Sequence, residues 1–250
     1  MEFAAALIDE HQAFADTIAG GDPAAPVPTC PGWTVQQLFR HVGRGVRWSA
    51  QMVLDQATES LDPRAVPGGK PPEDPAAATD WLTDGADKLL DAVNQTGADV
   101  PVWTFLGPRP SAWWIRRRLH EVVVHRADAA IAVGVDFELD PALAADAISE
   151  WLELVVPLSA ADAPPLAAGQ TIHLHAHDEG LGEAGEWLIS ADADGALSWS
   201  HGHGKGNVAV RGAVIDLLLA ITRRRPVADS GVEVLGDASV LQTWLDRTQF

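Results

Sequence analysis

The sequence predicts an α+β protein of two domains: a helical bundle over residues 1–160, then a smaller α+β domain over residues 165–250 with a mainly antiparallel sheet. One observation is the helical spacing of apolar residues that runs through the first half of the chain. Another is the breaker-rich stretch ADAPPLAAGQ, after which apolar and polar residues begin to alternate. At 250 residues the chain is long enough for one large domain or two modest ones.

The helices of the first half are expected from apolar periodicity and from start and stop signals. Thr34 and Gln37 match a capping box, so a helix should begin there. The segment DPRAVPGGKPPEDP, residues 62–75, is rich in Pro and Gly and is expected to be a loop. The expected helices cover residues 2–19, 34–57, 76–95, 111–133 and 141–156.

The second half shows the two-residue period of strands. The segment EWLISADADGALSWS is expected to form two short strands around a turn at Asp194 and Gly195. A helix in AVIDLLLAITRRRP should stop at Pro226, and ASVLQTWLDRTQF should form a closing helix. The remaining expected strands are TIHLHAH, NVAVRG and VEVLGD.

Composition argues against several classes of function. The formal net charge of −18 would repel the phosphates of a nucleic acid. No apolar run is long enough for a membrane span, and the acidic start MEFAAALIDE lacks the basic residues of a signal peptide. With Cys30 as the single cysteine no intramolecular disulfide can form, so a cytoplasmic location is expected.

The stretch LHEVVVHRAD contains the first candidate for chemistry. Glu121 and His125 are four residues apart and share one face of the expected helix. His120 and His125 are five apart, which is a near miss for the metalloprotease pattern H-E-x-x-H. His120 should therefore point elsewhere and be structural.

His41 borders the apolar face of the helix expected from residue 34, so it could meet Glu121 and His125 inside the bundle. Two His and one Glu with a fourth position open are the ligands of a catalytic zinc. The alternatives are a structural His41 and a simple surface pair of Glu121 with His125. Arg118 could bind an anionic group of a substrate or cofactor, or pair with Glu121. Asp128 could orient a ligand, or form a salt bridge between helices.

Other histidines and the cysteine are expected to have structural roles. TIHLHAH places His173, His175 and His177 on one strand face, but no carboxylate partner is obvious, so no second metal is expected there. HGHGKG, with His201 and His203, is expected to be a glycine-rich loop. Cys30 lies beside a helix start, where a thiolate would be favoured, yet a small buried cysteine is the commoner case.

Two motifs carry a family resemblance. CPGWTVQQLFRHVGR and RRRLHEVVVHRADAAIAVG resemble the mycothiol-dependent maleylpyruvate isomerase family of the DinB-like metal-binding superfamily, and LLLAITRRRP is similar as well. The resemblance implies a DinB-like four-helix bundle with a divalent metal, usually zinc, and a small α+β domain after it. Carried over to this sequence, the implied metal ligands are His41, Glu121 and His125.

The resemblance also implies an activity. A metal-bound thiolate of mycothiol would attack a small electrophilic substrate, and addition followed by bond rotation and elimination would give isomerisation. Loss of a leaving group would instead give S-transfer. The alternatives are a thiol-independent metal-dependent hydrolase or biosynthetic enzyme, and a non-catalytic metal-binding stress protein. The expected partners are the thiol and the electrophile, without nucleic acid or membrane, in a monomer or homodimer.

Overall fold

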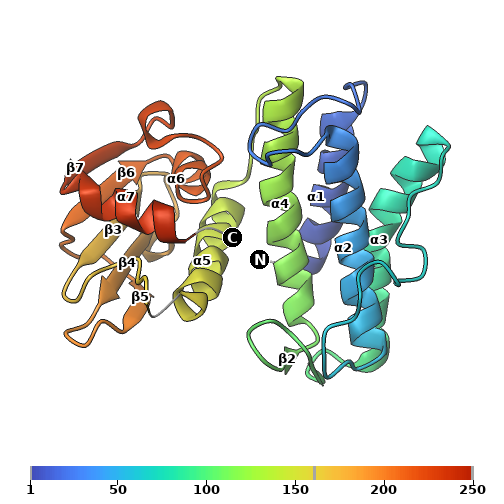
Figure 1. Ribbon diagram of the computed structural model, residues 1–250, viewed down its shortest axis with the longest axis horizontal. Coiled ribbons are helices and arrows are strands. Elements are labelled where there is room, and N and C mark those ends of the chain that lie inside the picture. The colour runs from blue at the N-terminus through green and yellow to red at the C-terminus, as the bar shows by residue number, and fades with distance from the viewer. Residues whose placement is uncertain (1, 160–161, 249–250) are drawn as a thin grey trace. The chain divides into compact units, whose positions relative to one another are not determined.

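The computed structural model describes residues 2–159 and 162–248, which divide between Phe137 and Glu138 into two compact units (Figure 1). The first unit is a bundle in which α2 packs against α3, and α1 against α4. A short hairpin precedes the last helix, and each of its strands, β1 (Pro101–Val102) and β2 (Arg109–Pro110), has two residues. The bundle helices are α1 (Phe3–Ile18), α2 (Val35–Leu54), α3 (Pro75–Thr96) and α4 (Trp113–Val133).

The helix ends follow from local chemistry. The capping box predicted at Thr34 is present, since its side chain accepts from the Gln37 amide and its own amide donates to the Gln37 side chain. Asp74 caps α3 by accepting from the Ala77 amide, with Pro75 in the first turn. Gly134 ends α4 in the left-handed conformation, at φ 74°. The four helices lie within three residues of their predicted limits.

The bundle core consists of apolar faces that the predicted periodicity placed inward. Phe14 of α1, Leu38 of α2, Leu82 of α3 and Val122 of α4 are all buried in one cluster. Burying such side chains contributes about 1.5–3 kcal/mol each. No helix in the described part of the chain is both long and apolar enough to cross a membrane.

The second unit is a five-stranded sheet with helices, and its strand order is β5-β4-β3-β6-β7. β3 pairs in parallel with β6 and the other pairs of this sheet are antiparallel, which agrees with the mainly antiparallel sheet that was predicted. The strands are β3 (Thr171–Ala176), β4 (Glu186–Ala191), β5 (Leu197–His201), β6 (Val208–Gly212) and β7 (Glu233–Gly236). The helices are α5 (Pro141–Leu158), α6 (Val214–Ile221) and α7 (Ala238–Arg247), with short 3₁₀ turns at Gly182–Gly185 and Val227–Asp229.

The boundary between the units differs from the one predicted at residues 160–165. α5 belongs to the second unit, because it packs against α6 and β5. Trp187 of β4 is fully buried and donates its indole N–H to Ser149 of α5 at 2.9 Å. An amphipathic helix must bury its apolar face, but its sequence does not say against which partner.

Candidate metal centre

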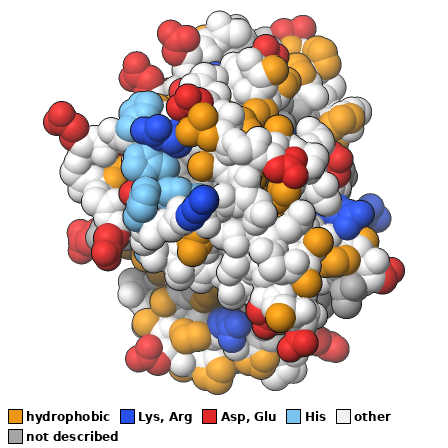
Figure 2. Space-filling view, turned by 90° about the vertical axis from the view of Figure 1, so that its left-hand side faces the viewer, with side chains coloured by type: hydrophobic (Ala, Val, Ile, Leu, Met, Phe, Trp, Pro, Cys, Tyr) orange, Lys and Arg blue, Asp and Glu red, His pale blue; other side chains and the backbone are white. Residues whose placement is uncertain are grey.

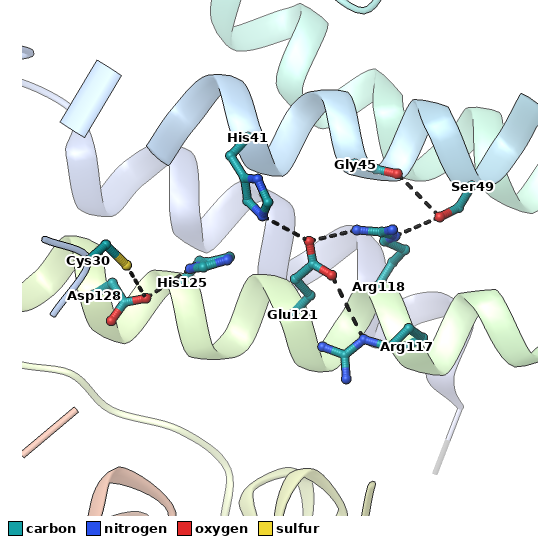
Figure 3. A network of polar contacts seen from close by, with 9 residues as sticks. All are labelled: Cys30, His41, Gly45, Ser49, Arg117, Arg118, Glu121, His125 and Asp128. Atoms are coloured by element: carbon teal, nitrogen blue, oxygen red, sulfur yellow. Dashed lines mark hydrogen bonds and ion pairs between the residues drawn. The ribbon is translucent and has the colours of Figure 1, made fainter. Parts of the chain in front are cut away.

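His41 of α2 comes together with Glu121 and His125 of α4 at a partly exposed position of the bundle, and we call these three residues the bundle centre (Figure 3). One ligand atom from each lies within 4.8 Å of the others. His41 Nε2 of α2 is 3.3 Å from Glu121 Oε1 of α4, and the two imidazole rings are 5.0 Å apart between centroids. The convergence predicted from helical spacing is therefore present.

Gly45 of α2 lets the two helices approach at this point. It lies one turn after His41, and a Cβ there would be 2.6 Å from Arg118 Nη1 and 3.3 Å from Glu121 Oε1. Any side chain would displace the groups that hold the Glu121 carboxylate. Sequence reasoning missed this residue, although a glycine inside the helix RHVGRGV was a signal, since glycine there costs about 1 kcal/mol against alanine.

Glu121 is kept ionised by two arginines. Arg118 Nη1 lies 2.6 Å from Oε1, and Arg117 Nε lies 3.8 Å from Oε2. Burial acts to raise the pKa of Glu121, but Arg118, followed by His41 and Arg117, holds that pKa well below its ordinary value. The carboxylate is therefore charged at neutral pH, as a metal ligand must be.

Arg118 is itself fixed in place. Its Nε donates to Ser49 Oγ at 2.6 Å, and its guanidinium lies 5.4 Å from the Trp48 ring centre and 5.2 Å from that of Trp114. Of the two roles considered from sequence, pairing with Glu121 is the contact present in the structure. Arg118 therefore positions the carboxylate.

His125 is oriented by Asp128, one turn further along α4. Its Nδ1 lies 2.8 Å from Asp128 Oδ2, which leaves Nε2 for a ligand. Burial holds the pKa of His125 below its ordinary value, although Asp128 acts in the opposite direction, so a neutral ring is favoured. Asp128 is completely buried and also accepts from Thr29 Oγ1 at 2.5 Å and Cys30 Sγ at 3.5 Å.

The remaining candidates border this centre or lie outside it. The Trp33 ring meets the His41 ring edge-on at 4.9 Å between centroids. Cys30, His125 and Asp128 form an overlapping group of possible ligands, so the cysteine is part of the surroundings of the centre. His120 is buried against Phe3 and is not a member of either group, in agreement with the prediction that it points elsewhere.

The donor set suits a divalent transition metal. Imidazole nitrogen and carboxylate oxygen are zinc ligands, and three protein ligands leave one of four tetrahedral positions for a small molecule. A neutral His125, an ionised Glu121 and the His125–Asp128 contact are the protonation states and outer contact that such a metal requires. The residues present therefore fit the metal that the sequence analysis expected.

Comparison with known proteins gives two family matches and a structural likeness. Residues 4–130 match the Mycothiol maleylpyruvate isomerase N-terminal domain, and residues 142–243 match the MDMPI C-terminal domain. The chain is similar to the crystal structures of the mycothiol-dependent maleylpyruvate isomerase and of a histidine-to-alanine mutant of it. Both have 15% sequence identity and a TM-score of 0.58, over 93% of this chain and 91% of the other. No protein of curated function matches the chain in sequence.

The two lines of comparison agree with the structure. The break between the family matches, from residue 130 to 142, contains the division observed at residues 137 and 138. At 15% identity the structural likeness shows the fold, while the two domain matches cover most of the chain. The chain therefore belongs to the mycothiol-dependent maleylpyruvate isomerase family, a family of enzymes.

Proposed function

We propose that this protein is a metal-dependent isomerase or S-transferase that uses mycothiol, with its metal held by His41, Glu121 and His125. The observation that carries the proposal is the convergence of these three side chains from two helices, within 4.8 Å of one another. Family membership supports mycothiol as the thiol and a small electrophile as the substrate. Zinc is the proposed metal because the ligands are two imidazoles and one carboxylate.

The charge of the centre favours an anionic fourth ligand. His41, Glu121 and His125 would hold a divalent metal with net positive charge left at the centre, and such a metal would lower the pKa of a thiol bound to it, which is otherwise about 8.5. Arg118 and Arg117 add positive charge next to Glu121. The site therefore stabilises negative charge on the reacting thiol at neutral pH.

The other residues orient the ligands. Asp128 holds the His125 ring through Nδ1, and Thr29 Oγ1 and Cys30 Sγ in turn donate to Asp128. Ser49 and the two tryptophans beside Arg118 hold that guanidinium against the carboxylate. These contacts fix the donor atoms before any substrate arrives, which is how outer partners raise affinity and rate. A reducing cytoplasm, where a small thiol stays reduced, is the proposed location.

The test is a comparison of turnover with and without mycothiol, using maleylpyruvate as the first electrophile and zinc content as a second readout. We expect thiol-dependent turnover, and His41→Ala should lose it together with one equivalent of zinc. His177→Ala, an exposed histidine of the second unit, is the matched control and should retain both. Unchanged zinc content and turnover in His41→Ala would overturn the proposed metal site. Turnover that needs the metal but is the same with and without mycothiol would overturn the thiol-dependent mechanism and favour a hydrolase.

A further inference from the structure

A second cluster of possible ligands lies on the sheet of the second unit. His173 and His175 come from β3, Glu186 begins β4, and His203 follows β5. One ligand atom from each lies within 4.8 Å of all the others. We call these four residues the sheet centre. They share no residue with the bundle centre.

Strand register explains why the carboxylate meets the histidines. In the antiparallel pair of β3 and β4, His175 lies directly opposite Glu186, so both side chains project from the same face. His173 is two residues before His175 and shares that face, while Ile172 and Leu174 are buried on the other. The carboxylate partner missing from the sequence analysis is therefore supplied by the neighbouring strand.

The glycines of HGHGKG bring the last histidine to the sheet. A Cβ on Gly204 would lie 2.8 Å from Leu188 Cδ1, and one on Gly206 would lie 3.0 Å from the backbone nitrogen of His173. Only glycine allows the loop to run this close to the strands. The loop thereby places His203 Nδ1 3.0 Å from Glu186 Oε2.

The interatomic distances are those of ion pairs, somewhat shorter than the separations between ligands around a metal, so small side-chain movements would accommodate an ion. His173 Nε2 is 2.6 Å from Glu186 Oε2, and His175 Nδ1 is 3.0 Å from Oε1. Ligands at about 2.0–2.1 Å from a tetrahedral zinc are separated from each other by about 3.3 Å. Among the described residues, the ion-pair partners of Glu186 are all imidazoles.

One of these nitrogens faces its ion-pair partner at a poor angle for a hydrogen bond. His175 Nδ1 is buried, and despite its distance of 3.0 Å from Glu186 Oε1 it is not aligned for a hydrogen bond with any group. A buried ring nitrogen without a hydrogen bond is costly. A metal ion accepts the lone pair of such a nitrogen and removes that cost.

The cluster opens onto solvent. It borders a surface cavity of about 670 Å³ that Lys205 and Arg211 also line. Figure 2 shows histidine side chains gathered in one patch, with Lys or Arg side chains beside them. The side chain of His203 is 78% exposed, so an ion can enter on its side.

We propose that His173, His175, Glu186 and His203 bind a second divalent transition metal, zinc by ligand type. Four protein ligands complete a tetrahedral shell, so this metal is structural and pins the loop of residues 202–206 to the sheet. The proposal does not depend on the function of the bundle centre.

The test is the zinc content of the full-length protein after equilibrium dialysis against micromolar zinc. We expect two equivalents in the wild type and one in either Glu186→Gln or His203→Asn. His177→Asn, on an exposed histidine just after β3, is the matched control and should keep two. Two equivalents retained in both Glu186→Gln and His203→Asn would overturn the proposal. Because His203 is on an exposed loop, its variant should fold normally, which circular dichroism checks.

Cobalt gives a second measurement that separates the two centres. In a His41→Ala background, where the bundle ligand set is incomplete, added Co²⁺ should still produce the visible absorption of a tetrahedral site. Adding His203→Asn should abolish that absorption. Absence of the absorption in His41→Ala alone, in protein that circular dichroism shows to be folded, would contradict a four-ligand site in the sheet.

Discussion

In the bundle centre the Glu121 carboxylate lies against two arginines, whereas in the sheet centre the Glu186 carboxylate lies among three imidazoles. Both centres use His and Glu, but the first has its negative charge compensated before any metal binds. In the second, no arginine or lysine is an ion-pair partner of the carboxylate in the described part of the chain. The arginines of the bundle centre hold its carboxylate in place without a metal. In the sheet centre, which has no such arginines among the described residues, a bound metal would stabilise the cluster.

The way the chain assembles each centre also differs. The bundle centre joins residues 80 positions apart, from α2 and α4, and needs Gly45 to bring the helices together. The sheet centre uses strand neighbours and a glycine loop within about 30 residues. The contrast predicts that zinc should stabilise the second unit more than the first.

The largest effect is expected from removing a ligand of the bundle centre. His125→Ala should lower thiol-dependent turnover by more than about 100-fold, because losing a ligand costs more than the 10–100-fold of losing an outer partner. Steady-state kinetics with and without added zinc measures this. Glu186→Gln should leave the bundle zinc bound, and equal loss of bundle zinc in both variants would show that the two centres are not independent.

A second effect concerns His11, which is buried in α1 and donates from Nδ1 to the Leu7 carbonyl, 2.8 Å away. Burial lowers its pKa from 6.5 to about 4, with Arg118 and Arg47 acting in the same direction. The unfolded chain binds this proton more readily, so the stability of the bundle should fall as pH drops from 6.5 to 4. The difference between the unfolded and folded pKa values of His11 corresponds to a loss of about 3 kcal/mol in the free energy of unfolding.

Hydrogen exchange at the amides of α1 measures this local stability in the intact chain. His11→Leu, which cannot take up a proton, should remove this part of the pH dependence. The exposed His177→Leu is the control. An unchanged slope between pH 4 and 6.5 in His11→Leu would show that another group causes the acid sensitivity.

Outer contacts should matter less than ligands. Asp128→Asn should weaken zinc binding at the bundle centre by about 10–100-fold, because His125 loses the carboxylate that orients its ring. Cys30→Ser retains a donor toward Asp128 and should cost less. Competition with a chelator measures both affinities, and a larger loss in Cys30→Ser would assign the metal to the overlapping Cys30 group.

The smallest effect concerns the arginine. With Arg118→Gln, burial should raise the pKa of Glu121 toward or above its ordinary value, while Arg117 and His41 oppose this. A carboxyl with a depressed folded pKa stabilises the protein above its unfolded pKa, and this stability is lost as pH falls through the folded pKa. The variant should therefore lose part of that stability. The ¹³C chemical shift of the Glu121 carboxyl in the metal-free protein measures this pKa. The same pKa in Arg118→Gln and in the wild type would show that Arg118 does not lower it.

Much of the fold and part of the centres could be predicted from sequence. Capping residues, breakers and apolar periods located the bundle helices, and the i, i+4 spacing of Glu121 and His125 selected the pair that His41 meets. Arg118 pairing with Glu121 was among the alternatives. These features are local or follow from one helix face.

What could not be predicted depends on partners distant in sequence. The attachment of α5 to the sheet was missed, because helix amphipathicity names no partner. Glu186 was overlooked as the carboxylate beside His175, because strand register is not visible in either strand alone. Thr29 and Cys30 reach Asp128 across about 100 residues, so no spacing could indicate them.

The most direct test of the central claim is anomalous diffraction at the zinc edge, from crystals of the full chain grown with zinc. The account predicts a peak about 2.0–2.2 Å from one atom each of His41, Glu121 and His125. A peak instead among Cys30, His125 and Asp128, or none in the bundle, would contradict it.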